Sequence, residues 1–107
     1  MYKIALVCEN GASTSMVVRK MKQSAQNQSI DALINAYPYT QLENFIAEYD
    51  VVLLGPQLGY KKELTLKEFS QYAAKVEVIN SMDFGMMNGE KILREAIELA
   101  DKNQGDV

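Results

Sequence analysis

The sequence contains no histidine, and its only cysteine is Cys8. Without histidine, the Ser-His-Asp and Cys-His arrangements of nucleophilic enzymes are excluded. One cysteine allows neither an internal disulfide nor a Cys-x-x-Cys redox pair, and it leaves too few ligands for a structural zinc site. The glycine patterns that hold nucleotide phosphates, Gly-x-Gly-x-x-Gly and Gly-Lys-Ser/Thr, are also missing. We therefore expect no metal and no cofactor, and any chemistry must use Cys8, hydroxyl groups or carboxylates.

Long apolar runs are lacking too. No stretch is long enough to span a bilayer, and Met1 to Ile4 do not place a basic region ahead of an apolar core, so we expect neither direct membrane insertion nor a signal peptide. The net charge of −3 argues against nucleic-acid binding. A lone cysteine fits a reducing compartment, which predicts a cytoplasmic location. At 107 residues and 48% hydrophobic content, we expect a single domain over 1–107, with residues 103–107 frayed.

Two hydrophobic periodicities alternate along the chain. Ile4 to Val7 and Val51 to Leu54 are continuous apolar runs, which are typical of strands buried on both faces. Helical spacing of apolar residues follows each predicted strand. We expect strands at 2–8, 30–37, 51–54 and 76–79. We expect helices from 13 or 14 to about 24, from a cap at Thr40 through 49, from 63 or 65 to 74, and from 90 to about 102. Segments 55–60 and 80–89 are predicted to be loops.

Four strand–helix units predict an α/β fold with a parallel sheet and helices on both faces. In such sheets, ligands bind beyond the carboxyl ends of the strands. That edge would gather the segment after Cys8, the 55–60 loop and the 81–89 loop. Gln57, Tyr60 and Asp83 are therefore candidates to line the site or to contact a partner, although ordinary loop positions explain them equally well.

The stretch that begins at Cys8 carries the strongest functional signal. Cys8 stands where the first strand is predicted to end, and a run of small and hydroxyl residues separates it from the first helix. A helix N-terminus attracts anions, and the same field stabilises a thiolate. Gly11 permits unusual backbone angles, while Ser13, Thr14 and Ser15 can cap the helix or bond phosphate oxygens. A cysteine packed in the core is the simpler alternative. The loop favours a site that holds a phosphoryl group and accepts it covalently.

Three functions compete for such a loop. Low-molecular-weight tyrosine phosphatases and related arsenate reductases place an arginine six residues after the cysteine and use an Asp-Pro loop as general acid. Here Thr14 occupies that position, Arg19 lies well inside the predicted helix, and no Asp-Pro is present, so a phosphoryl carrier is favoured over a phosphatase. A non-catalytic flavodoxin-like binding or receiver module requires an acidic pocket or a flavin-stacking aromatic, and the first loop offers only Glu9.

The segment from Cys8 to Ser15 is similar to the phosphocysteine loop of IIB components in the lactose/cellobiose branch of the bacterial sugar phosphotransferase system (PTS). The resemblance extends over residues 51–57, Tyr60 and residues 83–89, and it covers nearly the whole chain. Two positions depart from the family pattern, since Ala12 replaces a common methionine and Phe84 a frequent tyrosine. Neither touches the phosphorylated atom, but both bear on the shape of the site and the choice of partner.

The resemblance implies a four-stranded sheet in the order 2-1-3-4, similar to the low-molecular-weight tyrosine phosphatase fold. It also implies a phosphoryl relay, in which a histidine of a separate IIA protein phosphorylates Cys8. Cys8 then passes the group to a sugar bound by the membrane IIC component, at the inner face of the membrane. The implied sugar is a β-linked disaccharide such as cellobiose, chitobiose or lactose. We expect the Glu9 side chain to point into solvent or towards a partner. The residues implied to bind phosphate are Glu9, Asn10, Gly11, Ala12, Ser13, Thr14 and Ser15.

Overall fold

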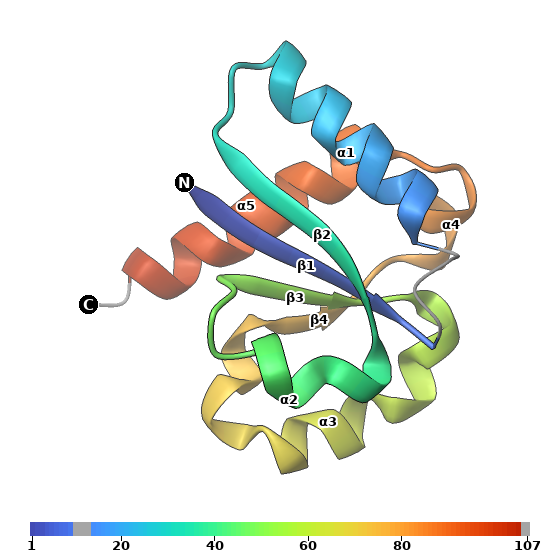
Figure 1. Ribbon diagram of the computed structural model, residues 1–107, viewed down its shortest axis with the longest axis vertical. Helices are drawn as coiled ribbons and strands as arrows, with labels where there is room; N and C mark the ends of the chain where they lie inside the picture. The colour runs from blue at the N-terminus through green and yellow to red at the C-terminus, as the bar shows by residue number, and fades with distance from the viewer. Residues whose placement is uncertain (10–13, 106–107) are drawn as a thin grey trace.

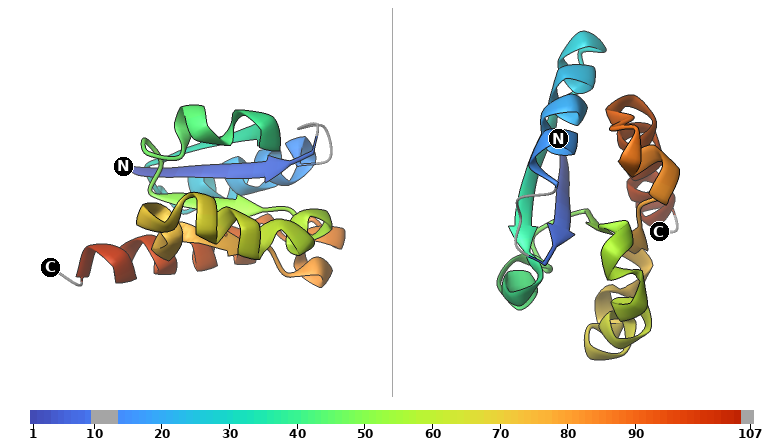
Figure 2. Two further views of the ribbon diagram at one scale, coloured as in Figure 1. Left: turned by 90° about the horizontal axis from the view of Figure 1, so that it is seen from below. Right: turned by 90° about the vertical axis from the view of Figure 1, so that its right-hand side faces the viewer.

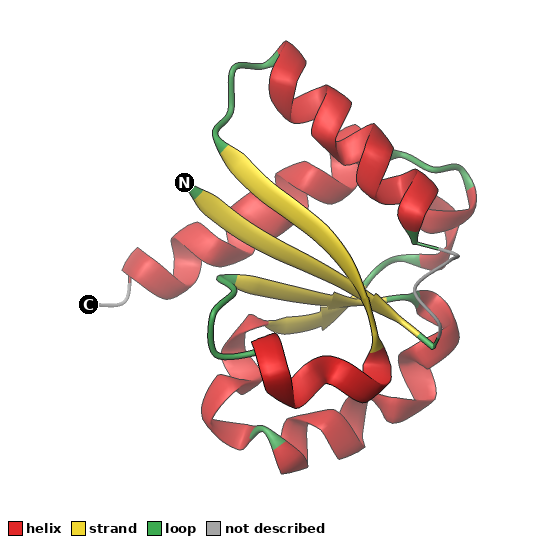
Figure 3. Cartoon of the chain, in the orientation of Figure 1, coloured by secondary structure: helices red, strands yellow, loops and turns green. Residues whose placement is uncertain are grey.

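The computed structural model describes residues 1–9 and 14–105. Its centre is a sheet of four parallel strands in the order β2-β1-β3-β4, which confirms the predicted topology (Figures 1 and 3). The strands and α-helices, in chain order, are β1 (Tyr2–Cys8), α1 (Ser15–Asn27), β2 (Ala32–Pro38), α2 (Leu42–Phe45), β3 (Val51–Leu54), α3 (Lys62–Glu68), β4 (Val76–Val78), α4 (Ser81–Gly85) and α5 (Gly89–Gly105). Three 3-10 helices join them, namely η1 (Tyr39–Gln41), η2 (Pro56–Lys61) and η3 (Ser70–Lys75).

Both faces of the sheet are covered, as the continuous apolar strands predicted. Alternate residues of β1 point to opposite faces, as in any strand. Ile4 and Leu6 pack with buried residues of α1 and α5, whereas Ala5 and Val7 pack with the apolar side of α2 and with Leu58. Figure 1 shows α5 crossing behind β1 and β2, and the left view of Figure 2 shows α2 and α5 on opposite sides of β1. The strands β1 and β3 are the two central strands of the sheet, and β1 ends at its carboxyl edge with Cys8.

Two segments predicted to be loops contain helical turns. Residues 80–89 include α4, because Asn80 caps its first turn by accepting hydrogen bonds from the N–H groups of Met82 and Asp83, at 2.9 and 3.1 Å. Such a cap satisfies N–H groups that a helix start otherwise leaves unpaired. Residues 56–61 form η2, which has Pro56 in its first turn, where the missing N–H costs nothing. Both predictions missed short helices that lack an apolar repeat.

Several other helix boundaries differ from those predicted from the sequence. The predicted third helix is divided into α3 and η3 at Phe69, and Thr40 does not cap α2. Helix α5 continues to Gly105 instead of ending near Lys102, which shortens the predicted frayed tail. Residues 106–107 lie outside the described part of the chain. None of the helices within the described ranges is long and apolar enough to cross a membrane.

The end of α1 explains why β2 begins at Ala32 and not at Ile30. Ser29 adopts a positive φ of 56°. The N–H of Ile30 then donates a hydrogen bond to the carbonyl of Ala25 at 2.8 Å, and the N–H of Ser29 donates one to the carbonyl of Gln26 at 3.2 Å. This pair of bonds is a Schellman motif, which commits Ile30 to the helix end.

The same motif gives a stability prediction. A left-handed residue other than glycine costs about 1–2 kcal/mol, and Ser29 is exposed, so Ser29→Gly should raise the free energy of unfolding by about 1 kcal/mol. Ser29→Val should lower it, because a β-branched side chain tolerates this conformation poorly. Urea unfolding of the two variants and the wild type measures the difference. A Ser29→Gly protein that is less stable than wild type would contradict the role of this turn.

Candidate functional site

Cys8 is the last residue of β1 and is fully buried. Its neighbours are fixed by the sheet, because β1 pairs Cys8 with Pro38 of β2, and the N–H of Gly55, just after β3, bonds the carbonyl of Val7 at 2.8 Å. The sulfur therefore lies at the carboxyl edge of the two central strands, where the sequence places the site. Burial alone would suit an ordinary core cysteine, so the polar contacts of the sulfur are the next observation to consider.

Thr14 supplies one such contact. Its hydroxyl donates a hydrogen bond to Sγ of Cys8 over 3.7 Å, and Thr14 is itself fully buried. Thr14 occupies the position before α1, yet its side chain makes no capping bond to the helix, while its carbonyl accepts the N–H of Val18 at 2.9 Å. The hydroxyl is thus directed at the sulfur. The structure thus places Thr14, one of the three hydroxyl residues named from the sequence, against Cys8.

The rest of the predicted phosphate-binding segment is only partly described. Asn10, Gly11, Ala12 and Ser13 lie outside the described residues, so the backbone cradle stays a prediction. Ser15 begins α1 and is exposed. Helix α1 therefore begins one or two residues later than the sequence predicted.

Glu9 and Tyr60 meet beside Cys8. Glu9 is exposed, as expected, and its Oε1 accepts a hydrogen bond from the Tyr60 hydroxyl at 3.0 Å. Tyr60 lies in η2, 51 residues further along the chain, so the fold brings a predicted site residue to the segment that follows the cysteine. The sequence named both residues but gave no sign that they would bond each other.

Gln57 also lies at this edge. It is exposed and belongs to η2, and this 3-10 helix begins directly after the buried Gly55. The Gln57 carboxamide folds back over Gly55, so that a Cβ built on Gly55 would lie only 2.8 Å from its Oε1. Since Gly55 bonds Val7, this places the Gln57 amide close to the end of β1. A Cβ at Gly55 would displace only the flexible end of the Gln57 side chain.

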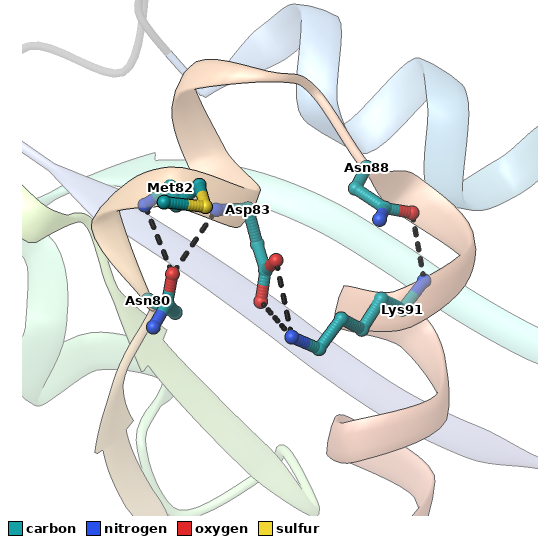
Figure 4. A network of polar contacts seen from close by, with 5 residues as sticks. All are labelled: Asn80, Met82, Asp83, Asn88 and Lys91. Carbon is teal, nitrogen blue, oxygen red and sulfur yellow. Dashed lines mark hydrogen bonds and ion pairs between the residues drawn. The ribbon is translucent and has the colours of Figure 1, made fainter.

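Asp83 has a different role. Its buried carboxylate holds Lys91 of α5, with Nζ 3.3 Å from Oδ1 and 3.1 Å from Oδ2 (Figure 4). The shorter contact lacks hydrogen-bond geometry, so charge attraction holds Oδ2. Lys91 is fixed in turn by its own N–H, which bonds Oδ1 of Asn88 at 3.2 Å. The carboxylate therefore ties α4 to α5, and a direct contact with a partner would require it to leave Lys91. Sequence reasoning missed Lys91, because no periodic spacing relates the two residues across the helix break.

Within the ranges 1–9 and 14–105, no group of three or more metal-ligating side chains is placed to hold a metal ion. The described part of the site therefore consists of a thiol, a hydroxyl directed at it, and the exposed polar side chains of Glu9, Gln57 and Tyr60. These groups can perform nucleophilic chemistry through sulfur and can hydrogen-bond an anion.

The chain matches, over residues 3–95, the family described as "PTS system, Lactose/Cellobiose specific IIB subunit". It is 40% identical to an oligo-beta-mannoside-specific EIIB component of Bacillus subtilis, over 92% of this chain and 96% of that protein. It is 37% identical to a galactose-specific EIIB component of Lactococcus lactis subsp. cremoris, over 90% of this chain and 94% of that protein.

Solved structures agree with these sequence matches. A cellobiose-specific phosphotransferase IIB protein from Borrelia burgdorferi superimposes with a TM-score of 0.81 at 38% identity, covering 94% of this chain and 93% of that one. A low-molecular-weight protein tyrosine phosphatase from Bacillus subtilis reaches 0.61 at 16% identity, covering 95% and 99%, and so shares the fold. The chain belongs to the lactose/cellobiose-specific IIB family and is a phosphotransferase, a phosphoryl carrier of the sugar PTS cascade.

Proposed function

We propose that the carried phosphoryl group is bound to Sγ of Cys8. The observation that supports this assignment is the hydrogen bond from the buried Thr14 hydroxyl to that sulfur. A hydroxyl directed at sulfur stabilises the thiolate, which is the nucleophilic form of cysteine. Cys8 is also the only cysteine, and the chain has no histidine that could carry the group instead.

The transfer consists of two displacements at phosphorus. In the first, the Cys8 thiolate attacks the phosphohistidine of a separate IIA protein, so that a P–S bond forms, the P–N bond breaks and the imidazole leaves with its electron pair. In the second, a sugar hydroxyl held by a membrane IIC component attacks the phosphorus, the P–S bond breaks, and the thiolate is regenerated while the hydroxyl proton passes to a base of the acceptor complex. The backbone N–H groups of residues 10–15 would stabilise charge on the phosphoryl oxygens in both steps.

A carrier must keep its phosphoryl group from water. The phosphatase that shares this fold is a useful contrast, because an arginine six residues after the cysteine binds phosphate bidentately in that family. Thr14 takes this position here and points a single hydroxyl at the sulfur. Without the guanidinium, hydrolysis of the phosphocysteine lacks an important source of transition-state stabilisation. We therefore favour transfer to a sugar over release of free phosphate.

The proposal extends to the acceptor sugar and to the location of the protein in the cell. Relatives named for oligo-beta-mannoside and cellobiose, whose sugars are β-linked, support a β-linked disaccharide such as cellobiose, chitobiose or lactose as the acceptor, whereas the relative named for galactose points to a single sugar ring. The protein would act in the cytoplasm, at the inner face of the membrane when it is docked to IIC. Transfer assays with a panel of these sugars, using membranes that contain the cognate IIC component, measure this specificity.

Thr14 provides the experiment for the proposed role of Cys8. Thr14→Val keeps the shape of the side chain and removes the hydroxyl, and we expect it to slow phosphorylation of Cys8 about tenfold or more, because a hydrogen bond to a charged group contributes about 1.5–3 kcal/mol. Thr14→Ser keeps the hydroxyl and should transfer at close to the wild-type rate. Rapid-quench measurement with a phosphorylated donor compares the three proteins. Equal rates for Thr14→Val and Thr14→Ser would show that the hydroxyl does not assist the sulfur.

A further inference from the structure

A groove lies between α1 and β2. These two elements lie next to each other in Figures 1 and 2. Its volume is about 400 Å³. Four residues of α1 that line it, Ser15, Arg19, Lys22 and Gln26, recur every three or four residues and so share one face of the helix. The rest of the lining is Val18 and Gln23 from α1, and Asn35 and Ala36 from β2. We call this the α1–β2 groove.

The groove is positively charged in an acidic protein. Helix α1 carries three basic residues and no acidic one; two of the three, Arg19 and Lys22, line the groove, and Lys20 does not. The whole chain has a net charge of −3, so removing these three positive charges leaves −6 on the remaining residues. Arg19 and Lys22 are both exposed, and neither forms an ion pair or a side-chain hydrogen bond with any residue in the described part of the chain. Their charges are therefore available to a partner.

The groove is also continuous with the site. Ser15, at one end of it, directly follows Thr14, whose hydroxyl bonds Cys8. From Ser15 to Gln26 the helix rises by about 16 Å, at about 1.5 Å per residue. A segment of another protein lying in the groove would thus extend from the reacting sulfur along α1. Its position fits a partner that exchanges the phosphoryl group.

We propose that the α1–β2 groove docks an acidic segment of the protein that donates the phosphoryl group to Cys8. Arg19 can bind a carboxylate bidentately and Lys22 adds a second positive charge, while Gln26 and Asn35 can hydrogen-bond the backbone of the segment. The membrane acceptor is a poorer match, because cytoplasmic loops of membrane proteins carry an excess of Lys and Arg, which the groove would repel. This inference rests on the proposed role of Cys8.

The test is the rate of Cys8 phosphorylation by the phosphorylated donor, measured over a range of donor and salt concentrations. The double variant Arg19→Ala, Lys22→Ala should lower kcat/KM about tenfold at low salt and leave kcat unchanged, because docking charges act on encounter. Its rate should also depend less on salt than that of the wild type. The matched control is Lys67→Ala, Lys102→Ala, which removes from α3 and α5 two exposed cations that form no ion pair with residues 1–9 or 14–105. The control should remain within about twofold of wild type.

Three results would overturn the inference. If the wild type is phosphorylated but the groove variant behaves like the control at every salt concentration, the donor does not dock in the groove. If the variant keeps a normal donor step and loses only transfer to the sugar, the groove serves the acceptor. If the wild type takes up no phosphoryl group from any donor, the proposed role of Cys8 fails and this inference fails with it. Melting curves of both variants verify that the fold is unchanged.

Discussion

Cys8→Ser is expected to abolish phosphoryl uptake from the donor and to reduce sugar phosphorylation by at least about 10³-fold, because the variant lacks the atom that forms the covalent intermediate. Serine is close to cysteine in size, and its hydroxyl can still bond Thr14. Its unionised hydroxyl is a far weaker nucleophile than a thiolate at neutral pH. The coupled assay with donor, IIC membranes and labelled sugar measures the loss.

The wild type supplies its own control for this prediction, since Cys8 is the only thiol. Alkylation by iodoacetamide therefore reports on one position. Cys8 is buried, so alkylation of the native protein should be slow compared with alkylation of the unfolded chain. Alkylated protein should lose transfer, and protein that has been phosphorylated first should resist alkylation. Full sugar phosphorylation by Cys8→Ser would refute the assignment of the carrier atom.

Gly89→Ala is expected to destabilise the protein by about 2–3 kcal/mol, which lowers the melting temperature by roughly 10–20 °C for a chain of this size. Gly89 is buried at the start of α5, where this helix touches the backbone of α1. A Cβ at Gly89 would lie 2.5 Å from the carbonyl carbon of Lys20 and 2.6 Å from the nitrogen of Met21. Backbone atoms cannot rotate away, so the two helices must separate. Thermal unfolding followed by circular dichroism measures the effect.

Gly85→Ala is the matched control. Gly85 is exposed at the end of α4, and a Cβ there would meet no atom within 4 Å. Alanine favours helix over glycine, so this variant should be as stable as wild type or slightly more stable. If Gly89→Ala has the same melting temperature as Gly85→Ala, the packing of α1 against α5 does not depend on close backbone contact. Because α1 begins beside Cys8, we also expect Gly89→Ala to slow phosphoryl transfer at temperatures where the protein stays folded.

The two central strands were predictable because a strand buried on both faces has an uninterrupted apolar sequence. Continuous apolar residues in Ile4 to Val7 and Val51 to Leu54 favour buried strands in a chain of this length, and β1 and β3 are the central strands. Short helices were missed where side-chain caps and not periodicity define them, as at Asn80. The extent of α1 was missed because the positive φ of Ser29 has no sequence signature.

The placement of Cys8 and Tyr60 at one edge of the sheet was predictable for a different reason. Parallel sheets gather the ends of their strands at one edge, so the alternation of strands and helices was enough to assign Cys8 and Tyr60 to one place. What each side chain bonds could not be predicted, because such contacts depend on packing between distant segments. The hydrogen bond from Tyr60 to Glu9 is one example. The ion pair between Lys91 and the buried carboxylate of Asp83 is another. The groove was missed because Arg19 and Lys22 resemble ordinary exposed positions of a helix.

The most direct test of the carrier atom is the intact mass of the protein after incubation with the phosphorylated donor, followed by peptide mapping under conditions that preserve thiophosphate. We predict a gain of one phosphoryl group, located on Cys8 and lost when an acceptor sugar and its IIC component are added. A phosphoryl group found on any other residue, or sugar phosphorylation without any phosphorylated intermediate of this protein, would contradict the account.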